Sequence, residues 1–381
     1  MMGAADKNDV IARARDFART RIAPEAARWS MGESPAQSLL ESAAALGLTG
    51  LEVPVGLGGL DAGFGIKAQV CEALAEADFG FAMSIVNTHN VAARLCASAG
   101  PALRDRHLPA LLSGRISACT ALTEPGAGSD FAAIRTQARP HQDSWRLTGE
   151  KTWIVNARHA GLAIVFAQCG KEGDAAGIGA FLVDLNQQGV RRHAIDSGFS
   201  QTSIGTGGFR LDDVNVPAEA LLLAPGSAFR TILTEINGAR AYVAAMCNGM
   251  LRTALDQVRD YGARRVSFGN PLDSYPGWRA PLGQAETELA ASRALTARAV
   301  DLVASGQDAQ LAAAAAKLFA VETCQRALPL LLHAMGAEGL RPEYCFTRHL
   351  AAAQVAGLTD GASSILRDRV SRLAPRRQGQ D

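Results

Sequence analysis

A polar segment at residues 121–130 has the residue types of a ligand-binding loop, with the sequence ALTEPGAGSD. Pro125 fixes φ and the glycines permit φ > 0, so the composition predicts a turn. Thr123 and Ser129 place a hydroxyl on either side of it, and Gly128 lets the backbone come close to a flat or anionic group. Taken alone, the same composition also fits a simple connecting loop.

A second block at residues 149–157, with the sequence GEKTWIVNA, favours the ligand-binding interpretation of the first block over a connecting loop. The order and separation of the two blocks resemble the acyl-CoA dehydrogenase family of flavoenzymes. The resemblance covers nearly the whole chain, because further ordered matches occur in GLEVP at 50–54, DVNVP at 213–217 and RVSFGNPL at 265–272. A glycine-rich stretch at 205–208 follows no clear strand and opens no helix, so it is a weak dinucleotide-binding signal.

The resemblance implies FAD as cofactor. In the family the first block lines the flavin and the acyl thioester, and the tryptophan of the second block covers the flavin ring. Carried over by position, the residues along the flavin are Leu122, Thr123, Gly128, Ser129 and Trp153. Arg265 and Phe268 match the motif that clasps the FAD pyrophosphate of a neighbouring subunit, a task for which the arginine fork is suited. His333 and Gly336 fall where the family has Gln and Gly for the adenosine half.

The implied reaction is α,β-dehydrogenation of an acyl thioester. A base removes the α-proton, a hydride leaves the β-carbon for flavin N5, and hydrogen-bond donors stabilise the charge on the thioester carbonyl. The family's base is a Glu in a Glu-Gly turn before the last helix, and Asp360-Gly361 stands there in this chain. Asp360 is either this base, one methylene shorter than Glu, or a helix N-cap, and one residue can do both. Glu235 is a weak backup, because the other position used by relatives is Ala239.

Substrate binding is expected at Ser129, Arg240 and Gly361. Arg240 matches the helix arginine that touches the coenzyme A arm in the family, although a neighbouring Asp of the family is Asn237 here. The acyl group is carried either by coenzyme A or by the phosphopantetheine of a carrier protein. Several other family positions around the site differ, at Thr120, Val155, 351–353 and Ala362. The rewritten rim predicts an unusual substrate.

Two other functions remain open on the sequence. One is a flavin oxidase of the nitroalkane-oxidase type, a branch of the superfamily that also has Asp at the base position. The other is a catalytically silent subunit that pairs with an active paralogue. The resemblance also implies a homodimer or homotetramer, with electrons passed to an electron-transfer flavoprotein or to O₂.

Composition excludes several classes. Lys and Arg number 38 against 37 Asp and Glu, for a net charge of +1, which argues against a nucleic-acid-binding surface. The seven cysteines include no CxxC pair and favour reduced thiols over disulfides or a metal site. No apolar run reaches about 18 residues and the N-terminus lacks a signal core, so no membrane span and a cytoplasmic protein are expected.

The elements that must hold these residues follow a helix, strand, helix order. Helical periodicity is expected at 6–30, where Pro24 ends the pattern, and at 35–47, 64–79 and 80–99, with a lone His89 that receives no role. Short β-type runs fill 118–225, and helices return at 226–262, 281–305, 308–335 and 343–371. The sequence therefore predicts an N-terminal helical domain (1–117), a middle antiparallel β domain (118–225) and a C-terminal four-helix bundle (226–381). The fold class is mostly α with a central β domain, as in the acyl-CoA dehydrogenases.

Overall fold

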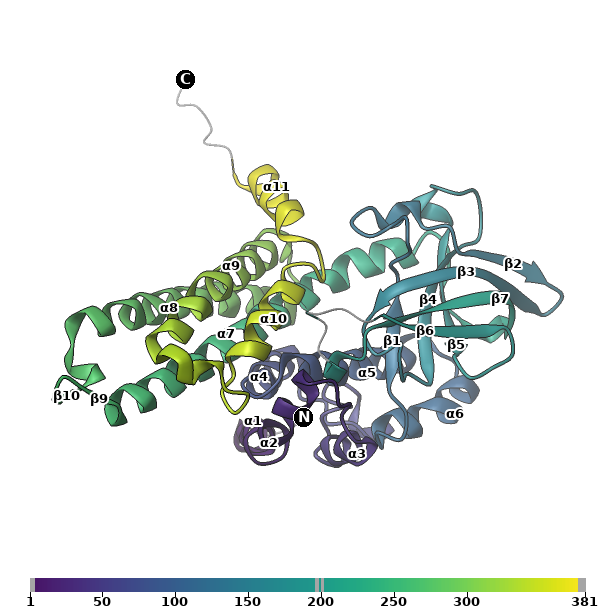
Figure 1. Ribbon diagram of the computed structural model, residues 1–381. Helices are drawn as coiled ribbons and strands as arrows, with labels where there is room; N and C mark the ends of the chain where they lie inside the picture. Colours follow the sequence, from purple (N-terminus) through teal and green to yellow (C-terminus); the bar gives the residue numbers. More distant parts are fainter. Residues whose placement is uncertain (1–3, 196–198, 200–201, 376–381) are drawn as a thin grey trace, which may run out of the picture.

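The computed structural model describes residues 4–195, 199 and 202–375. A β domain lies at one end of the molecule and a long helical bundle at the other, with the N-terminal helices between and below them (Figure 1). The predicted fold class is confirmed. Within the described residues, no helix is both long and apolar enough to cross a membrane.

The N-terminal part is helical. Its α-helices are α1 (Ala4–Phe17), α2 (Ala23–Ser30), α3 (Gln37–Ala45), α4 (Phe64–Ala75), α5 (Phe79–Ser98) and α6 (Pro101–Leu112). The expectation that Pro24 ends the helical pattern is wrong. Pro24 lies in the first turn of α2, where a missing N–H is tolerated. A π-helical turn at Ala18–Ile22 joins α1 to α2.

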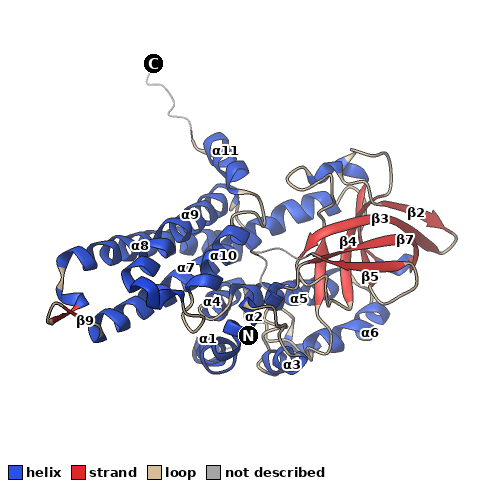
Figure 2. Ribbon diagram, viewed as in Figure 1, coloured by secondary structure: helices blue, strands red, loops and turns tan. Residues whose placement is uncertain are grey.

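The β domain is one sheet of eight strands in the order β6-β7-β3-β2-β4-β5-β8, with β1 paired to β4. Its strands are β1 (Ala118–Ala121), β2 (Gln137–His141), β3 (Ser144–Ile154), β4 (Leu162–Gln168), β5 (Ile178–Asp184), β6 (Val190–Ala194), β7 (Gly207–Pro217) and β8 (Leu221–Leu223). The pairings are antiparallel apart from β1 with β4 and β2 with β4. The β3 arrow points from the sheet toward the bundle (Figure 2).

The C-terminal part is a bundle of long helices. These are α7 (Ala228–Arg264), α8 (Pro276–Ala304), α9 (Gln310–Met335), α10 (Phe346–Ala356) and α11 (Ser363–Leu373), and a small hairpin of β9 (Val266–Ser267) and β10 (Asn270–Pro271) follows α7. The expectation of one helix over 343–371 is wrong, because a turn at 357–362 separates α10 from α11. That turn contains Asp360.

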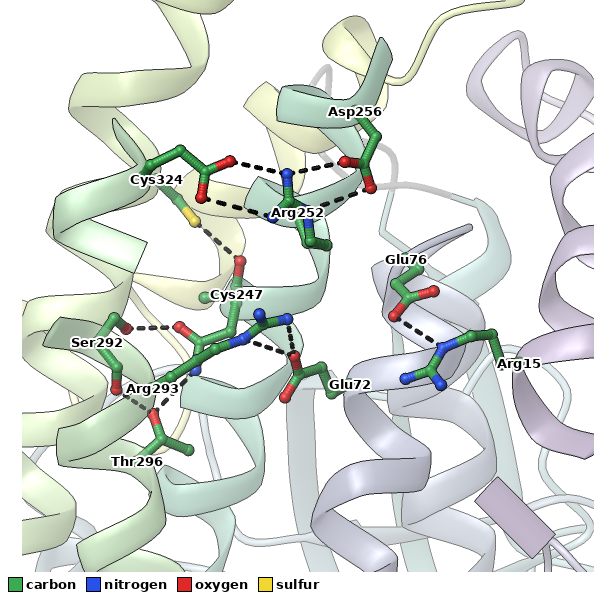
Figure 3. A network of polar contacts seen from close by, with 12 residues as sticks. Arg15, Glu72, Glu76, Cys247, Arg252, Asp256, Ser292, Arg293, Thr296 and Cys324 are labelled. Carbon is green, nitrogen blue, oxygen red and sulfur yellow. Dashed lines mark hydrogen bonds and ion pairs between the residues drawn. The ribbon is translucent and has the colours of Figure 1, made fainter. Parts of the chain in front are cut away.

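Polar contacts tie the bundle to the N-terminal helices (Figure 3). Between α7 and α8, the Asn248 amide donates to Thr296 at 3.1 Å and its carbonyl accepts from Ser292 at 2.5 Å. Arg293 of α8 reaches Glu72 of α4 at 2.6 Å. The Asn248 bonds satisfy polar groups that the packing of α7 against α8 buries. The Arg293–Glu72 pair links α8 to α4.

Helix α5 joins two apolar cores. Its first half, including Phe79 and Phe81, packs into a core shared with α1, α4 and the bundle. Its second half, including Val91 and Leu95, packs into the core of the β domain. Both domains therefore fix the position of α5 and of the side chains that it carries.

Candidate active site

Asp360 lies in the turn between α10 and α11, with a left-handed φ of 50°. Asp adopts this region more readily than most residues, because its short polar side chain bonds locally. The N-cap of α11 is Ala362, two residues later. The Asp360 carboxylate instead accepts a hydrogen bond from the Thr359 hydroxyl at 3.2 Å. The interpretation of Asp360 as the helix cap is therefore wrong, and its carboxylate is left for other chemistry.

Lys317 of α9 binds the backbone of this turn. Its side chain is fully buried, and its ammonium group donates to the carbonyl of Thr359 and, at 2.7 Å, to that of Gly361. The two residues that flank Asp360 are thus fixed by one cation. Burial lowers the pKa of Lys317 to about 8, against the attraction of the Asp360 carboxylate. Lys317 is not among the residues predicted for the site, although it is the single charged residue in the apolar run 311–321.

Arg240 of α7 also binds the backbone of the turn. Its Nε donates to the carbonyl of Asp360 at 3.1 Å, and one terminal nitrogen donates to Asn237 at 3.0 Å. The side chain is buried, which lowers its pKa to about 10, and nearby Arg369 acts in the same direction. Arg240 and Gly361 are therefore brought to Asp360, and the contact of Arg240 with the acyl carrier stays a prediction.

The environment of Asp360 suits a general base. Burial raises the pKa of its carboxyl above the ordinary value, while the Lys317 ammonium, the Thr359 hydroxyl and Arg240 oppose that rise. Desolvation makes the carboxylate more basic, and the two cations stabilise its ionised form. The alternatives are less suitable, because Glu235 is bound to Arg94 at a half-exposed position and Ala239 has no carboxyl group.

The 121–130 loop is anchored by an ion pair between two residues that were not predicted for the site, Glu124 and Lys151. Glu124 accepts from the hydroxyl of Thr136 at 2.6 Å and from the Lys151 ammonium at 2.7 Å. Lys151 also donates to the carbonyl of Leu122 at 3.1 Å. Burial lowers the pKa of Lys151 to about 8, against the opposing charge of Glu124. This pair joins the two sequence blocks that carried the resemblance.

Trp153 stands beside this loop with an unusual backbone and an exposed ring. Its φ is 57°, it falls at a register shift between β3 and β7, and it is 58% exposed. A bulky residue at positive φ is strained, and such strain is often found where a ligand binds. The preceding residue, Thr152, donates its N–H to the carbonyl of Thr123 at 3.1 Å.

The neighbouring loop residues leave room for a ligand. Leu122 and Thr123 are half-buried, whereas Gly128 and Ser129 are exposed. A Cβ added at Gly128 would meet no atom within 4 Å. An exposed aromatic ring beside an open, polar backbone edge fits a flat heteroaromatic cofactor such as a flavin, which would cover Trp153.

The other four predicted cofactor residues lie together at the far end of the bundle. Arg265 and Phe268 belong to the β9–β10 hairpin, where Phe268 is 95% exposed. His333 and Gly336 lie at the end of α9. Trp278 connects this end of α9 to the end of α7: its indole N–H donates to the Ala334 carbonyl at 2.8 Å, and its ring lies against Gly262. Figure 1 shows the hairpin at the end of the molecule opposite the sheet.

These two groups lie in different parts of one chain. The loop and Trp153 belong to the β domain, whereas the β9–β10 hairpin lies at the end of the molecule opposite the sheet (Figure 1). Arg240, which binds the Asp360 turn, is 25 residues before Arg265, which directly follows the last residue of α7; this corresponds to about 37 Å at a helical rise of about 1.5 Å per residue. The hairpin group is therefore far from the Asp360 turn of its own chain.

Three domain descriptions of one family match the chain in order. They are "Acyl-CoA dehydrogenase, N-terminal domain" over residues 4–115, the "middle domain" over 119–214 and the "C-terminal domain" over 226–374. Together they account for nearly every described residue. The matches leave out little more than the segments at 116–118 and 215–225 and the chain ends.

Individual relatives agree with the domain matches. A probable acyl-CoA dehydrogenase of Bacillus subtilis, YngJ, is 32% identical over 93% of both chains. The structure of butyryl-CoA dehydrogenase from Megasphaera elsdenii has a TM-score of 0.92 at 26% identity and covers 99% of this chain and all of its own. A chain from the structure of the electron transferring flavoprotein of Acidaminococcus fermentans has a TM-score of 0.92 at 25% identity, with 99% of each chain covered. The chain belongs to the acyl-CoA dehydrogenase family of FAD-dependent oxidoreductases.

Proposed function

We propose that this enzyme dehydrogenates an acyl thioester between Cα and Cβ, with the thioester carried by coenzyme A or by a phosphopantetheine arm. The observation that carries the proposal is the Asp360 turn. It presents a carboxylate that caps no helix, on a turn whose backbone carbonyls are bound by Lys317 and Arg240. The similarity to a butyryl-CoA dehydrogenase supports a thioester substrate.

The roles of the residues follow from their chemistry. Asp360 removes the α-proton and holds it on its carboxyl group, while the two electrons of that C–H bond form the new double bond as a hydride leaves Cβ. Bound FAD supplies the acceptor for this hydride. The N–H groups of Asp360 and Gly361 have no acceptor among the described residues, so they are available to polarise the thioester carbonyl. Ser129 and Arg240 complete the proposed substrate contacts.

The proposed FAD site is completed by a second copy of the chain. Leu122, Thr123, Gly128, Ser129 and Trp153 of one copy hold the flavin. The far-end group of the other copy holds the pyrophosphate and adenosine with Arg265, Phe268, His333 and Gly336. A homodimer satisfies this requirement, and a homotetramer built from two such dimers does as well. The 95% exposure of Phe268 supports the idea that another chain covers this end of the bundle.

The proposed electron acceptor is an electron-transfer flavoprotein. The match with a chain from the structure of such a flavoprotein supports this class of partner. The seven free cysteines of the chain support a reducing compartment, for which the cytoplasm is the simplest proposal.

Anaerobic bleaching of the bound flavin tests the reaction. The purified protein would be mixed with acyl-CoA esters, with the same acyl groups on phosphopantetheine, and with a nitroalkane. The proposal expects the flavin absorbance to fall with at least one thioester and not with the nitroalkane. Bleaching by the nitroalkane alone would establish the oxidase alternative. FAD-loaded protein that no substrate bleaches would favour the silent-subunit alternative.

A further inference from the structure

A largely buried polar cluster that the reaction does not use lies where α4, α5 and α7 meet the segment 50–54. It consists of Glu52, Lys67, His89, Asn90 and Tyr242. The buried Lys67 ammonium donates to Glu52 at 2.7 Å and to the side-chain amide oxygen of Asn90 at 2.8 Å, and His89 Nε2 is 3.1 Å from the same Glu52 oxygen. The Asn90 amide donates to the Tyr242 hydroxyl at 3.3 Å. The Lys67 ammonium also lies 5.6 Å from the centre of the Tyr242 ring.

Tyr242 is the member of the cluster on which the charge of the catalytic turn acts. It follows Arg240 by two positions on α7, so the two side chains leave the helix in different directions, and Arg240 donates to the Asp360 carbonyl. Burial raises the pKa of Tyr242 well above its ordinary value, and the negative charges of Asp360 and Glu52 raise it further. The phenol therefore keeps its proton at neutral pH and lies within electrostatic range of the base.

A polar face of α5 leads from the flavin side of the site to this phenol. Ser84, Asn87 and Asn90 are spaced three residues apart and share one face of the helix, and all three are half-buried among buried neighbours. The Ser84 carbonyl accepts from the side chain of Asn156 at 2.9 Å, three residues after Trp153 in the chain. Hydrogen-bonding groups therefore line this face of α5 between the Asn156 contact and Tyr242.

The charges of the cluster cancel and one donor remains unused. Burial acts to raise the pKa of Glu52, but the hydrogen bond of His89 and the charge of Lys67 outweigh it and lower that pKa to about 2. Glu52 thus balances Lys67, and burial lowers the pKa of His89, which leaves it neutral at pH 7. The Tyr242 oxygen accepts from Asn90, while its own proton has no acceptor within the described part of the chain.

We propose that the cluster forms the end of the acyl pocket and selects acyl groups with a neutral oxygen acceptor, a hydroxyl or a carbonyl, beyond Cβ. This inference rests on the proposed thioester chemistry. A hydrocarbon chain would leave the Tyr242 proton desolvated without a partner, which costs binding free energy. An added carboxylate or ammonium would compete within the balanced pair of Lys67 and Glu52, so a neutral group fits better.

The test compares acyl-CoA esters of equal length by the rate constant of anaerobic flavin bleaching per unit concentration. Butyryl-CoA is paired with 4-hydroxybutyryl-CoA, and hexanoyl-CoA with 5-oxohexanoyl-CoA. The oxygen-bearing ester of at least one pair is expected to react about tenfold faster, the upper range for one neutral hydrogen bond. In Tyr242→Phe this preference should fall to about one, because only the oxygen-bearing ester loses a contact. Tyr261→Phe, with the same change about 28 Å along α7, is the matched control and should keep the preference.

The outcomes separate the two claims. Equal or faster reaction of the hydrocarbon esters overturns the polar pocket and leaves the proposed function standing. An unchanged preference in Tyr242→Phe overturns the role of this cluster in the same way. If no thioester bleaches the flavin, the proposed function itself fails, and the inference fails with it.

Discussion

Replacing Lys317 by Met removes the cation that holds the Asp360 turn and keeps most of the side-chain volume. Lys317 is fully buried, and its ammonium binds the carbonyls of Thr359 and Gly361, on either side of Asp360. In Lys317→Met both carbonyls lose their donor, and Asp360 loses its largest source of electrostatic stabilisation. We therefore expect the variant to fold but to carry a misplaced and less ionised base.

The expected changes in folding stability and in reaction rate differ in size. Two hydrogen bonds from a charged donor contribute about 3–6 kcal/mol together. The shift of the Lys317 pKa from 10.5 to about 8 shows that burial of the charge opposes this, by about 3 kcal/mol. The net loss of stability is then only about 0–3 kcal/mol. Misplacement of a catalytic group by about 1 Å costs about 10²-fold in rate, so activity should suffer far more than folding.

The assay is the pH dependence of flavin reduction by a thioester. Removing the cation raises the pKa of the Asp360 carboxyl, so the rise in rate with pH should move to higher pH in Lys317→Met. Lys151→Met is the matched control, because Lys151 is equally buried and its pKa is also lowered to about 8, but it holds Glu124. It should weaken FAD retention without moving the pH profile. An acid limb that stays in place in Lys317→Met, or that moves equally in both variants, would refute the reasoning.

Three other predictions follow from the same structure. Arg265→Ala should weaken FAD retention by about 1.5–3 kcal/mol by removing a charge-assisted contact, as measured by flavin release on dilution, and a flavin-loaded monomer in sedimentation would contradict the shared site. The pKa of Glu52 is 4.5 in the unfolded chain and about 2 in the fold. Ionised Glu52 therefore stabilises the fold above pH 4.5 by at most about 3 kcal/mol, and this contribution is lost as the pH falls toward 2. Glu52→Gln should make the acid unfolding profile less steep in this range, and an equally steep profile would contradict the prediction. Asp360→Glu should lower activity for two reasons: the longer side chain misplaces the carboxylate in a pocket shaped around Asp, and Glu is less favourable than Asp at a φ of 50°. A faster variant in the flavin-bleaching assay would show that the pocket accepts the family's usual base.

The sequence was sufficient for the fold class and the family. Helical and alternating periodicities are local, and the ordered blocks around Trp153 and Arg265 are specific in combination, so the fold class was predicted correctly. Helix ends were predicted less well. Periodicity alone predicted one helix over 343–371, because helical spacing continues on both sides of 357–362. Only the family resemblance placed Asp360 and Gly361 in a turn before the last helix.

The supporting residues of the site could not be predicted from patterns. Lys317 and Lys67 each sit in an apolar helix, where spacing does not reveal which distant carbonyl or carboxylate a buried ammonium will meet. His89 was given no role because a lone histidine has no visible partner in the sequence, whereas in the fold it lies 3.1 Å from Glu52. Such pairs are separated by tens of residues and become visible only after the helices pack.

The most direct test of the account is anaerobic flavin reduction in Asp360→Asn. Asn tolerates the left-handed backbone of this turn, so the variant should keep its fold and its FAD, as checked by absorbance and thermal unfolding. With no carboxylate to take the α-proton, its rate of bleaching by the best thioester should fall by about 10²-fold or more. Glu235→Gln should reduce flavin at nearly the wild-type rate. Wild-type bleaching in Asp360→Asn, or loss of bleaching in Glu235→Gln alone, would contradict the assignment of Asp360 as the base.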